Sequence, residues 1–148
     1  MFRESLACSA APSTANMKIL LVEDSKFLRL ATERAMVRAG YEVTSAADGE
    51  EGLRLARETL PDLILLDMLL PKLSGPDVLK ALKLDPATAA IPVVVMSGLS
   101  QKNAARLEKD GAFAFLEKSE LALDQGPEPL LVKLESIKKQ LSAAAGRK

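Results

Sequence analysis

The apolar run Leu63-Ile64-Leu65-Leu66, which ends in Asp67, constrains the fold of this chain more than any other stretch. Four consecutive apolar residues without polar alternation predict a strand that is buried on both faces. Strands of this kind occur in parallel sheets that helices cover on both sides, and such sheets bind ligands at the carboxyl ends of their strands. Asp67 is therefore a candidate site residue, provided that other strands deliver polar groups to the same edge.

The rest of the chain alternates between predicted strands and predicted helices. The predicted strands are 18–22, 41–46, 63–66, 91–96 and 112–116, and the predicted helices are 26–39, 48–59, 74–84, 101–110 and 130–141. Gly40, Pro61 and Gly111 mark ends of helices, as glycine and proline commonly do. Five strand–helix units predict an α/β fold with a parallel sheet between two layers of helices, because right-handed crossovers place the helices on both faces.

Length and charge limit the class of protein. The 148 residues fit one domain, which we expect at 17–141, between a disordered leader, 1–16, and a C-terminal tail, 142–148. Lys and Arg balance Asp and Glu at 20 each, so no net charge attracts the chain to nucleic acid or to a membrane surface. No segment reaches the roughly 20 apolar residues of a membrane helix. A single cysteine, Cys8, excludes an internal disulfide and favours a cytoplasmic location.

The chain contains no histidine, which excludes Ser-His-Asp and Cys-His catalytic centres and histidine-ligated metal sites. It also lacks the glycine-rich loops that bind nucleotides, G-x-x-x-x-G-K-[ST] and G-x-G-x-x-G. Any chemistry must therefore rest on carboxylates, hydroxyls and lysines.

Polar residues of these types follow four of the five predicted strands. Glu23 and Asp24 follow the first strand, Asp67 the third, Ser97 the fourth and Lys118 the fifth. If these strands are neighbours, their carboxyl ends meet at one edge of the sheet. We expect the five side chains to converge there.

Such a cluster suits phosphoryl transfer. Three carboxylates raise one another's pKa unless cations compensate them, and Mg²⁺ together with the Lys118 ammonium would do so. Mg²⁺ prefers oxygen ligands, so Asp24 and Asp67 can bind it directly and Glu23 can hold a metal-bound water. One carboxylate can then attack a phosphorus atom, while Mg²⁺, Lys118 and the Ser97 hydroxyl stabilise the phosphoryl oxygens.

Four motifs stand in order at the predicted strand ends, and together they are more specific than any one alone. They are Ile19-Leu-Leu-Val-Glu-Asp-Ser25, Leu65-Leu-Asp-Met-Leu-Leu-Pro71, Ser97-Gly98 and Lys118. In these motifs the chain resembles the receiver domain of bacterial two-component response regulators, over about residues 17–141. The resemblance implies a flavodoxin-like (βα)5 doubly wound sheet with strand order 2-1-3-4-5. It further implies that Asp67 accepts a phosphoryl group from a phosphohistidine of a sensor histidine kinase or phosphotransfer protein, and that the backbone carbonyl of Leu69 completes the Mg²⁺ shell.

The resemblance also implies a switch. In this family a Ser or Thr moves toward the phosphoryl group and an aromatic ring fills the vacated space; here these are Ser97 and Phe115. The change would alter the face formed by residues 101–110, 112–116 and 130–141, on which a downstream protein would dock. We expect no turnover of a separate substrate, so no enzyme in the usual sense, and pairing with a second copy is left open.

Three positions depart from the family pattern. Ser119 follows Lys118 where proline is usual and its peptide bond commonly cis; a cis bond before another residue costs about 2.5–4 kcal/mol. Phe115 replaces a frequent tyrosine, so it can pack but cannot donate a hydrogen bond. Leu69 and Leu99 place apolar groups beside Asp67, which predicts slow self-dephosphorylation.

Three other functions are alternatives to a phosphoacceptor. A receiver-like interaction module that works without phosphorylation would keep the fold and lose a site residue. A flavin mononucleotide carrier would need a Ser/Thr/Gly-rich phosphate loop where Glu23 and Asp24 stand. A phosphoaspartate hydrolase usually has a second Asp at the position of Leu69.

Overall fold

The computed structural model describes residues 17–68, 75–97, 111–117 and 128–145. Its strands are β2 (Lys18–Val22), β3 (Glu42–Ala46), β4 (Leu63–Asp67), β5 (Val93–Ser97) and β6 (Ala114–Glu117). Its helices are α1 (Lys26–Arg38), α2 (Gly49–Thr59), α3 (Gly75–Leu84) and α6 (Glu128–Ala145). The predicted helix at 101–110 lies outside the described residues.

The five strands form one parallel sheet in the order β3-β2-β4-β5-β6, so the expected order 2-1-3-4-5 is confirmed. The register pairs Val22 of β2 with Leu66 of β4, and Asp67 of β4 with Met96 of β5. The carboxyl ends of β2, β4 and β5 are therefore level with one another. Polar residues that follow these strands are brought to one edge.

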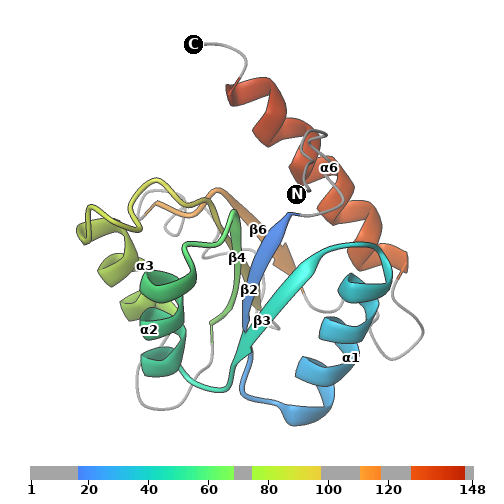
Figure 1. The fold of residues 1–148 in the computed structure, drawn as a ribbon, viewed down its shortest axis with the longest axis horizontal. Helices are drawn as coiled ribbons and strands as arrows, with labels where there is room; N and C mark the ends of the chain where they lie inside the picture. Colours follow the sequence, from blue (N-terminus) through green and yellow to red (C-terminus); the bar gives the residue numbers. More distant parts are fainter. Residues whose placement is uncertain (1–16, 69–74, 98–110, 118–127, 146–148) are drawn as a thin grey trace, which may run out of the picture.

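Helices cover both faces of the sheet, with α2 and α3 on one side and α1 and α6 on the other (Figure 1). Alternate residues of each strand point to opposite faces of the sheet, so their side chains pack into two separate hydrophobic cores. On the α2–α3 side the core contains Leu20, Val22, Ile64, Leu66, Val78, Leu79, Leu82, Val93 and Val95. On the α1–α6 side it contains Ile19, Leu21, Met36, Leu63, Leu65, Val94, Met96, Leu130, Leu134 and Ile137.

The central strand β4 is buried along its whole length, as the unbroken apolar run predicted. The edge strand β3 is partly exposed, which agrees with its mixed composition. Burial of β4 includes its terminal residue Asp67, so a carboxylate lies at the end of the most enclosed strand.

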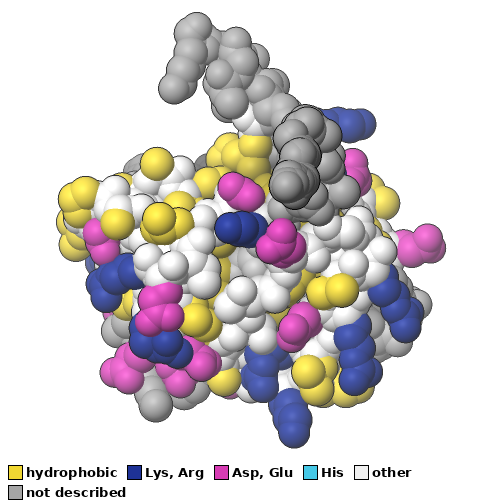
Figure 2. All heavy atoms as spheres, in the orientation of Figure 1, with side chains coloured by type: hydrophobic (Ala, Val, Ile, Leu, Met, Phe, Trp, Pro, Cys, Tyr) yellow, Lys and Arg dark blue, Asp and Glu magenta, His cyan; other side chains and the backbone are white. Residues whose placement is uncertain are grey.

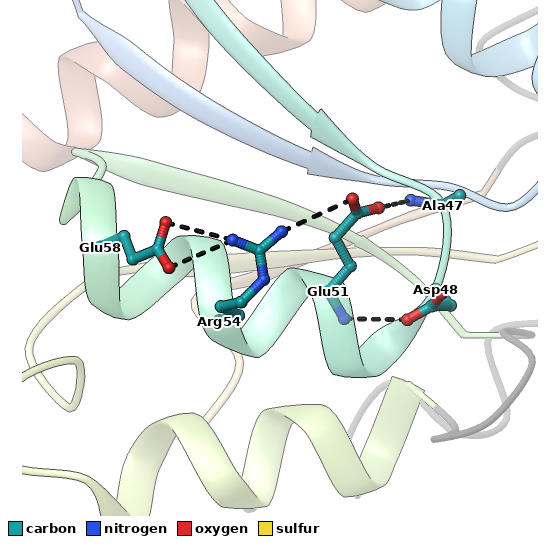
Figure 3. Close-up of polar contacts among 5 residues, drawn as sticks. All are labelled: Ala47, Asp48, Glu51, Arg54 and Glu58. Carbon is teal, nitrogen blue, oxygen red and sulfur yellow. Dashed lines mark hydrogen bonds and ion pairs between the residues drawn. The ribbon is translucent and has the colours of Figure 1, made fainter.

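Helix α2 begins in a capping arrangement (Figure 3). The Asp48 carboxylate accepts a hydrogen bond from the Glu51 amide at 2.8 Å, and the Glu51 carboxylate accepts one from the Ala47 amide at 2.8 Å. Further along, Arg54 forms an ion pair with Glu58 at 3.1 Å. The acidic residues of this stretch thus stabilise the start and the exposed side of the helix.

Most element boundaries lie within one residue of the predictions, and the largest differences are in β5, β6 and α6. β5 begins at Val93 because Pro92 has no amide hydrogen to donate to the sheet, although Ile91 is buried. β6 begins at Ala114, after Gly111 turns the chain with a positive φ of 111°. α6 continues to Ala145, beyond its predicted end at Leu141. None of the described helices is long and apolar enough to cross a membrane.

Candidate functional site

Three carboxylates meet at the carboxyl edge of the sheet. Oxygen atoms of Glu23, Asp24 and Asp67 all lie within 4.8 Å of one another. The sheet register explains this, because Val22 and Leu66 are partners and the acidic residues come directly after them. The predicted convergence of β2 and β4 at this edge is therefore present in the fold.

The three carboxylates differ in exposure. Glu23 and Asp67 are buried, with 2% and 3% of their surface accessible, whereas Asp24 is exposed. Buried carboxylates are costly unless polar groups or cations compensate them, and both buried residues do take part in polar interactions. The cluster is thus open to solvent on the side of Asp24 and enclosed on the side of Asp67.

Glu23 is held through its main chain and its side chain. Its amide donates to the Ala46 carbonyl at 3.0 Å, and its carboxylate accepts from the Ser25 amide at 3.2 Å. Its carbonyl accepts from the Arg29 guanidinium Nη1 at 3.1 Å. Arg29 was not among the predicted site residues, because its only sequence signal is a basic residue one turn into the helix that follows the acidic pair.

Gly75 packs the start of α3 against the end of β4. Its amide donates to the Met68 carbonyl at 3.0 Å. A Cβ atom at this position would lie 2.6 Å from the carbonyl oxygen of Asp67 and 2.6 Å from the Met68 Cα. Pro76 predicted a helix start here, but no sequence signal showed that the residue before it must be glycine.

The donor set fits a Mg²⁺ ion. All three side chains offer carboxylate oxygens, the ligand type that Mg²⁺ prefers. Oxygens within 4.8 Å of one another are close enough for one small cation to contact them, directly or through a bound water.

Of the remaining predicted site residues, only Phe115 is fully within the described residues. The backbone of Ser97 ends β5 and pairs with Glu117, the last residue of β6. The strands β5 and β6 therefore end at the same edge of the sheet. The Ser97 side chain, Leu69, Lys118, Leu99 and Ser119 lie outside the described part of the chain. Phe115 of β6 is partly buried and packs against the core on the α2–α3 side.

Comparison with protein families finds one matching model. Residues 19–125 match the response regulator receiver domain. The matched region begins in β2 and includes all three carboxylates of the cluster.

Two curated proteins illustrate the similarity. The chain is 42% identical over 116 residues to a gliding motility regulatory protein of Myxococcus xanthus, a match that spans 77% of this chain and 15% of that protein. It is 38% identical over 102 residues to the polar-differentiation response regulator DivK of Brucella anthropi, which spans 68% of this chain and 82% of DivK. The chain thus corresponds to a small part of the first protein and to most of the second.

A solved structure shows the same fold. The chemotaxis response regulator CheY4 of Vibrio cholerae superimposes with a TM-score of 0.74 at 29% sequence identity. The match covers 82% of this chain and 98% of the CheY4 chain.

Proposed function

We propose that this chain, which belongs to the response regulator receiver family, accepts a phosphoryl group on Asp67 in a reaction that depends on Mg²⁺. Receiver domains are signalling modules of two-component systems that interact with histidine kinases or phosphotransfer proteins. The observation that carries the proposal is the meeting of Glu23, Asp24 and Asp67 at the carboxyl edge of the sheet. A carboxylate oxygen of Asp67 attacks the phosphorus of a phosphohistidine, so that an O–P bond forms and the P–N bond breaks. The imidazole nitrogen keeps the electron pair and takes up a proton.

The cluster supplies the ligands of the metal. Asp24 and Asp67 would bind Mg²⁺ directly, Glu23 would hold one of its waters, and the Leu69 carbonyl would complete the shell. When bound, Mg²⁺ offsets the carboxylate charge and stabilises the negative phosphoryl oxygens. The enclosed position of Asp67 limits the access of water, while the exposed Asp24 leaves the site open to a donor.

Lys118 and Ser97 would hold the other phosphoryl oxygens, the former as a cation and the latter as a hydroxyl donor. Movement of Ser97 would couple to Phe115, which lies on the neighbouring strand and packs into the core. That change would alter the face built from residues 101–110, β6 and α6, where a downstream protein would dock. We expect no turnover of a separate substrate.

Helix α1 offers a docking face to the phosphoryl donor, because it begins immediately after the acidic pair. Phe27, Leu30 and Val37 are exposed on this helix at helical spacing, and a surface groove is lined by Leu30, Glu33, Arg34, Val37 and Arg38. Basic side chains gather over α1, whereas acidic and basic side chains are mixed over α2 (Figure 2). An apolar stripe with a basic border suits a partner helix that carries apolar and acidic residues.

The test is formation of an acyl phosphate on the protein, measured as an increase in its mass. The full chain is incubated with acetyl phosphate, with and without Mg²⁺, beside Asp67→Asn as the control. A gain of one phosphoryl group that needs Mg²⁺ and is absent in Asp67→Asn would support the proposal. No gain under any condition would favour the phosphorylation-independent interaction module.

A further inference from the structure

We infer that Arg29 is a positioning residue for the acidic cluster, fixing the peptide between Glu23 and Asp24 and thereby the geometry offered to a divalent cation. The inference rests on the proposed function, since it concerns the same metal site. Arg29 lies one turn into α1 and is itself only partly exposed.

The bond from Arg29 acts on the peptide that carries Asp24. Its guanidinium Nη1 donates to the Glu23 carbonyl at 3.1 Å. Because a peptide unit is planar, fixing this carbonyl also fixes the direction in which the Asp24 Cα leaves the strand. The amide of Glu23 is held on its other side by the Ala46 carbonyl at 3.0 Å, so both peptide planes around Glu23 are constrained.

Arg29 is also anchored through its main chain to the same turn. Its amide donates to the Ser25 carbonyl at 2.8 Å, and the Ser25 hydroxyl caps α1 by accepting from the Leu28 amide at 3.3 Å. The Ser25 amide in turn donates to the Glu23 carboxylate at 3.2 Å. The side chain and the backbone of Arg29 therefore hold opposite ends of the segment from Glu23 to Ser25.

The charge of Arg29 and its positioning role predict opposite effects on metal binding. A guanidinium near the cluster repels a cation, so if charge alone mattered, neutralising Arg29 would tighten Mg²⁺ binding. If Arg29 orders the ligands, removing it weakens binding, as loss of partners outside the ligand shell commonly does by roughly 10- to 100-fold. The sign of the change separates the two explanations.

The experiment measures Mg²⁺ affinity of the full chain by calorimetric titration with Mg²⁺ alone. Arg29→Met removes the donor and the charge, Arg29→Lys keeps the charge and one donor, and Arg34→Met removes a charge from the exposed side of the same helix. We expect Kd to rise about 10-fold in Arg29→Met, to recover largely in Arg29→Lys, and to stay within about 2-fold in Arg34→Met.

A second readout needs no metal. In amide NMR spectra of the metal-free protein, the resonances of Asp24 and Ser25 should move in Arg29→Met and stay in place in Arg34→Met. Unchanged or tighter Mg²⁺ binding in Arg29→Met, or equal weakening in Arg34→Met, would overturn the inference while the wild type still binds Mg²⁺. Absence of Mg²⁺ binding in the wild type would instead overturn the proposed function together with this inference.

Discussion

The Gly75 amide donates a hydrogen bond to the Met68 carbonyl at 3.0 Å, which joins the first residue of α3 to the residue after Asp67. A Cβ atom on Gly75 would lie 2.6 Å from the Asp67 carbonyl oxygen. The obstructing atoms belong to the backbone, so a side chain could be accommodated only by moving β4 or α3. Gly75 thus determines how closely α3 approaches the backbone that carries the candidate phosphoacceptor.

Gly75→Ala should therefore disturb both stability and phosphorylation. We expect the free energy of unfolding to fall by about 1–3 kcal/mol, as overpacked sites show, and phosphoryl uptake on Asp67 to slow. Urea unfolding and the acetyl phosphate reaction measure these effects. The control is Gly52→Ala, whose Cβ would meet the Val22 side chain at 2.9 Å and not the backbone of β4. Equal phosphorylation rates in the two variants would contradict a specific role for Gly75.

Asp24→Asn should stabilise the metal-free protein and weaken its response to metal. Neutralising one of three carboxylates within 4.8 Å of one another removes repulsion that at this range amounts to about 1 kcal/mol per pair in water. We expect a higher Tm without Mg²⁺ and a smaller rise in Tm when Mg²⁺ is added. Thermal unfolding with and without Mg²⁺ checks both parts, and an unchanged response to Mg²⁺ would remove Asp24 from the ligand set.

Phe27→Ser should impair transfer from a protein donor but not from a small one. Phe27 is 71% exposed on α1, so its substitution removes docking surface with little effect on folding. We expect about 10-fold slower transfer from the best donor in a panel of phosphorylated histidine kinases, and an unchanged rate with acetyl phosphate. Leu84→Ser, at an 83% exposed residue of α3, is the matched control. A similar loss in both variants would argue against docking on α1.

Leu60→Gly, a substitution outside the carboxylate cluster, should raise the free energy of unfolding. Leu60 ends α2 in the left-handed region, with φ 46°, and is 53% exposed. Relief of the roughly 1–2 kcal/mol steric cost, less the roughly 0.5–1 kcal/mol entropy cost of glycine, leaves a gain of up to about 1.5 kcal/mol. Leu60→Ala keeps the Cβ atom and should show no such gain in urea unfolding. A gain of equal size in Leu60→Ala would assign the effect to the lost apolar side chain.

Glu135→Gln should reduce the loss in free energy of unfolding that occurs as the pH falls into the acid range. The Lys138 ammonium, 2.9 Å from the Glu135 carboxylate, and the Tyr41 hydroxyl, 3.5 Å away, hold the pKa of Glu135 below its usual 4.5. A lowered carboxyl pKa adds stability above pH 4.5 that is lost as the pH falls through the folded pKa. Urea unfolding between about pH 6 and pH 3 should show less loss in Glu135→Gln than in the wild type. Glu50→Gln, at an exposed glutamate of α2, should behave like the wild type.

Local sequence signals determined most of the secondary structure. The apolar run before Asp67 predicted a buried strand and β4 is one; β2 has the predicted bounds, 18–22. These predictions succeed because periodicity and breakers such as Pro61 act within one element. The same signals put Glu23, Asp24 and Asp67 at strand ends, which was enough to propose the chemistry. The order of the strands, by contrast, came from the resemblance of four motifs to a known family.

The tertiary structure alone decided which groups make contact at the edge of the sheet. The bond from Arg29 to Glu23, the close approach of Gly75 to Asp67, and the link between Tyr41 of the α1–β3 turn and Glu135 of α6 leave no periodic trace in the sequence. Each depends on the packing distance between elements, which is set by side chains from both cores at once. Residues 44 positions apart, Glu23 and Asp67, become neighbours because β2 pairs with β4, and that pairing is a property of the whole sheet.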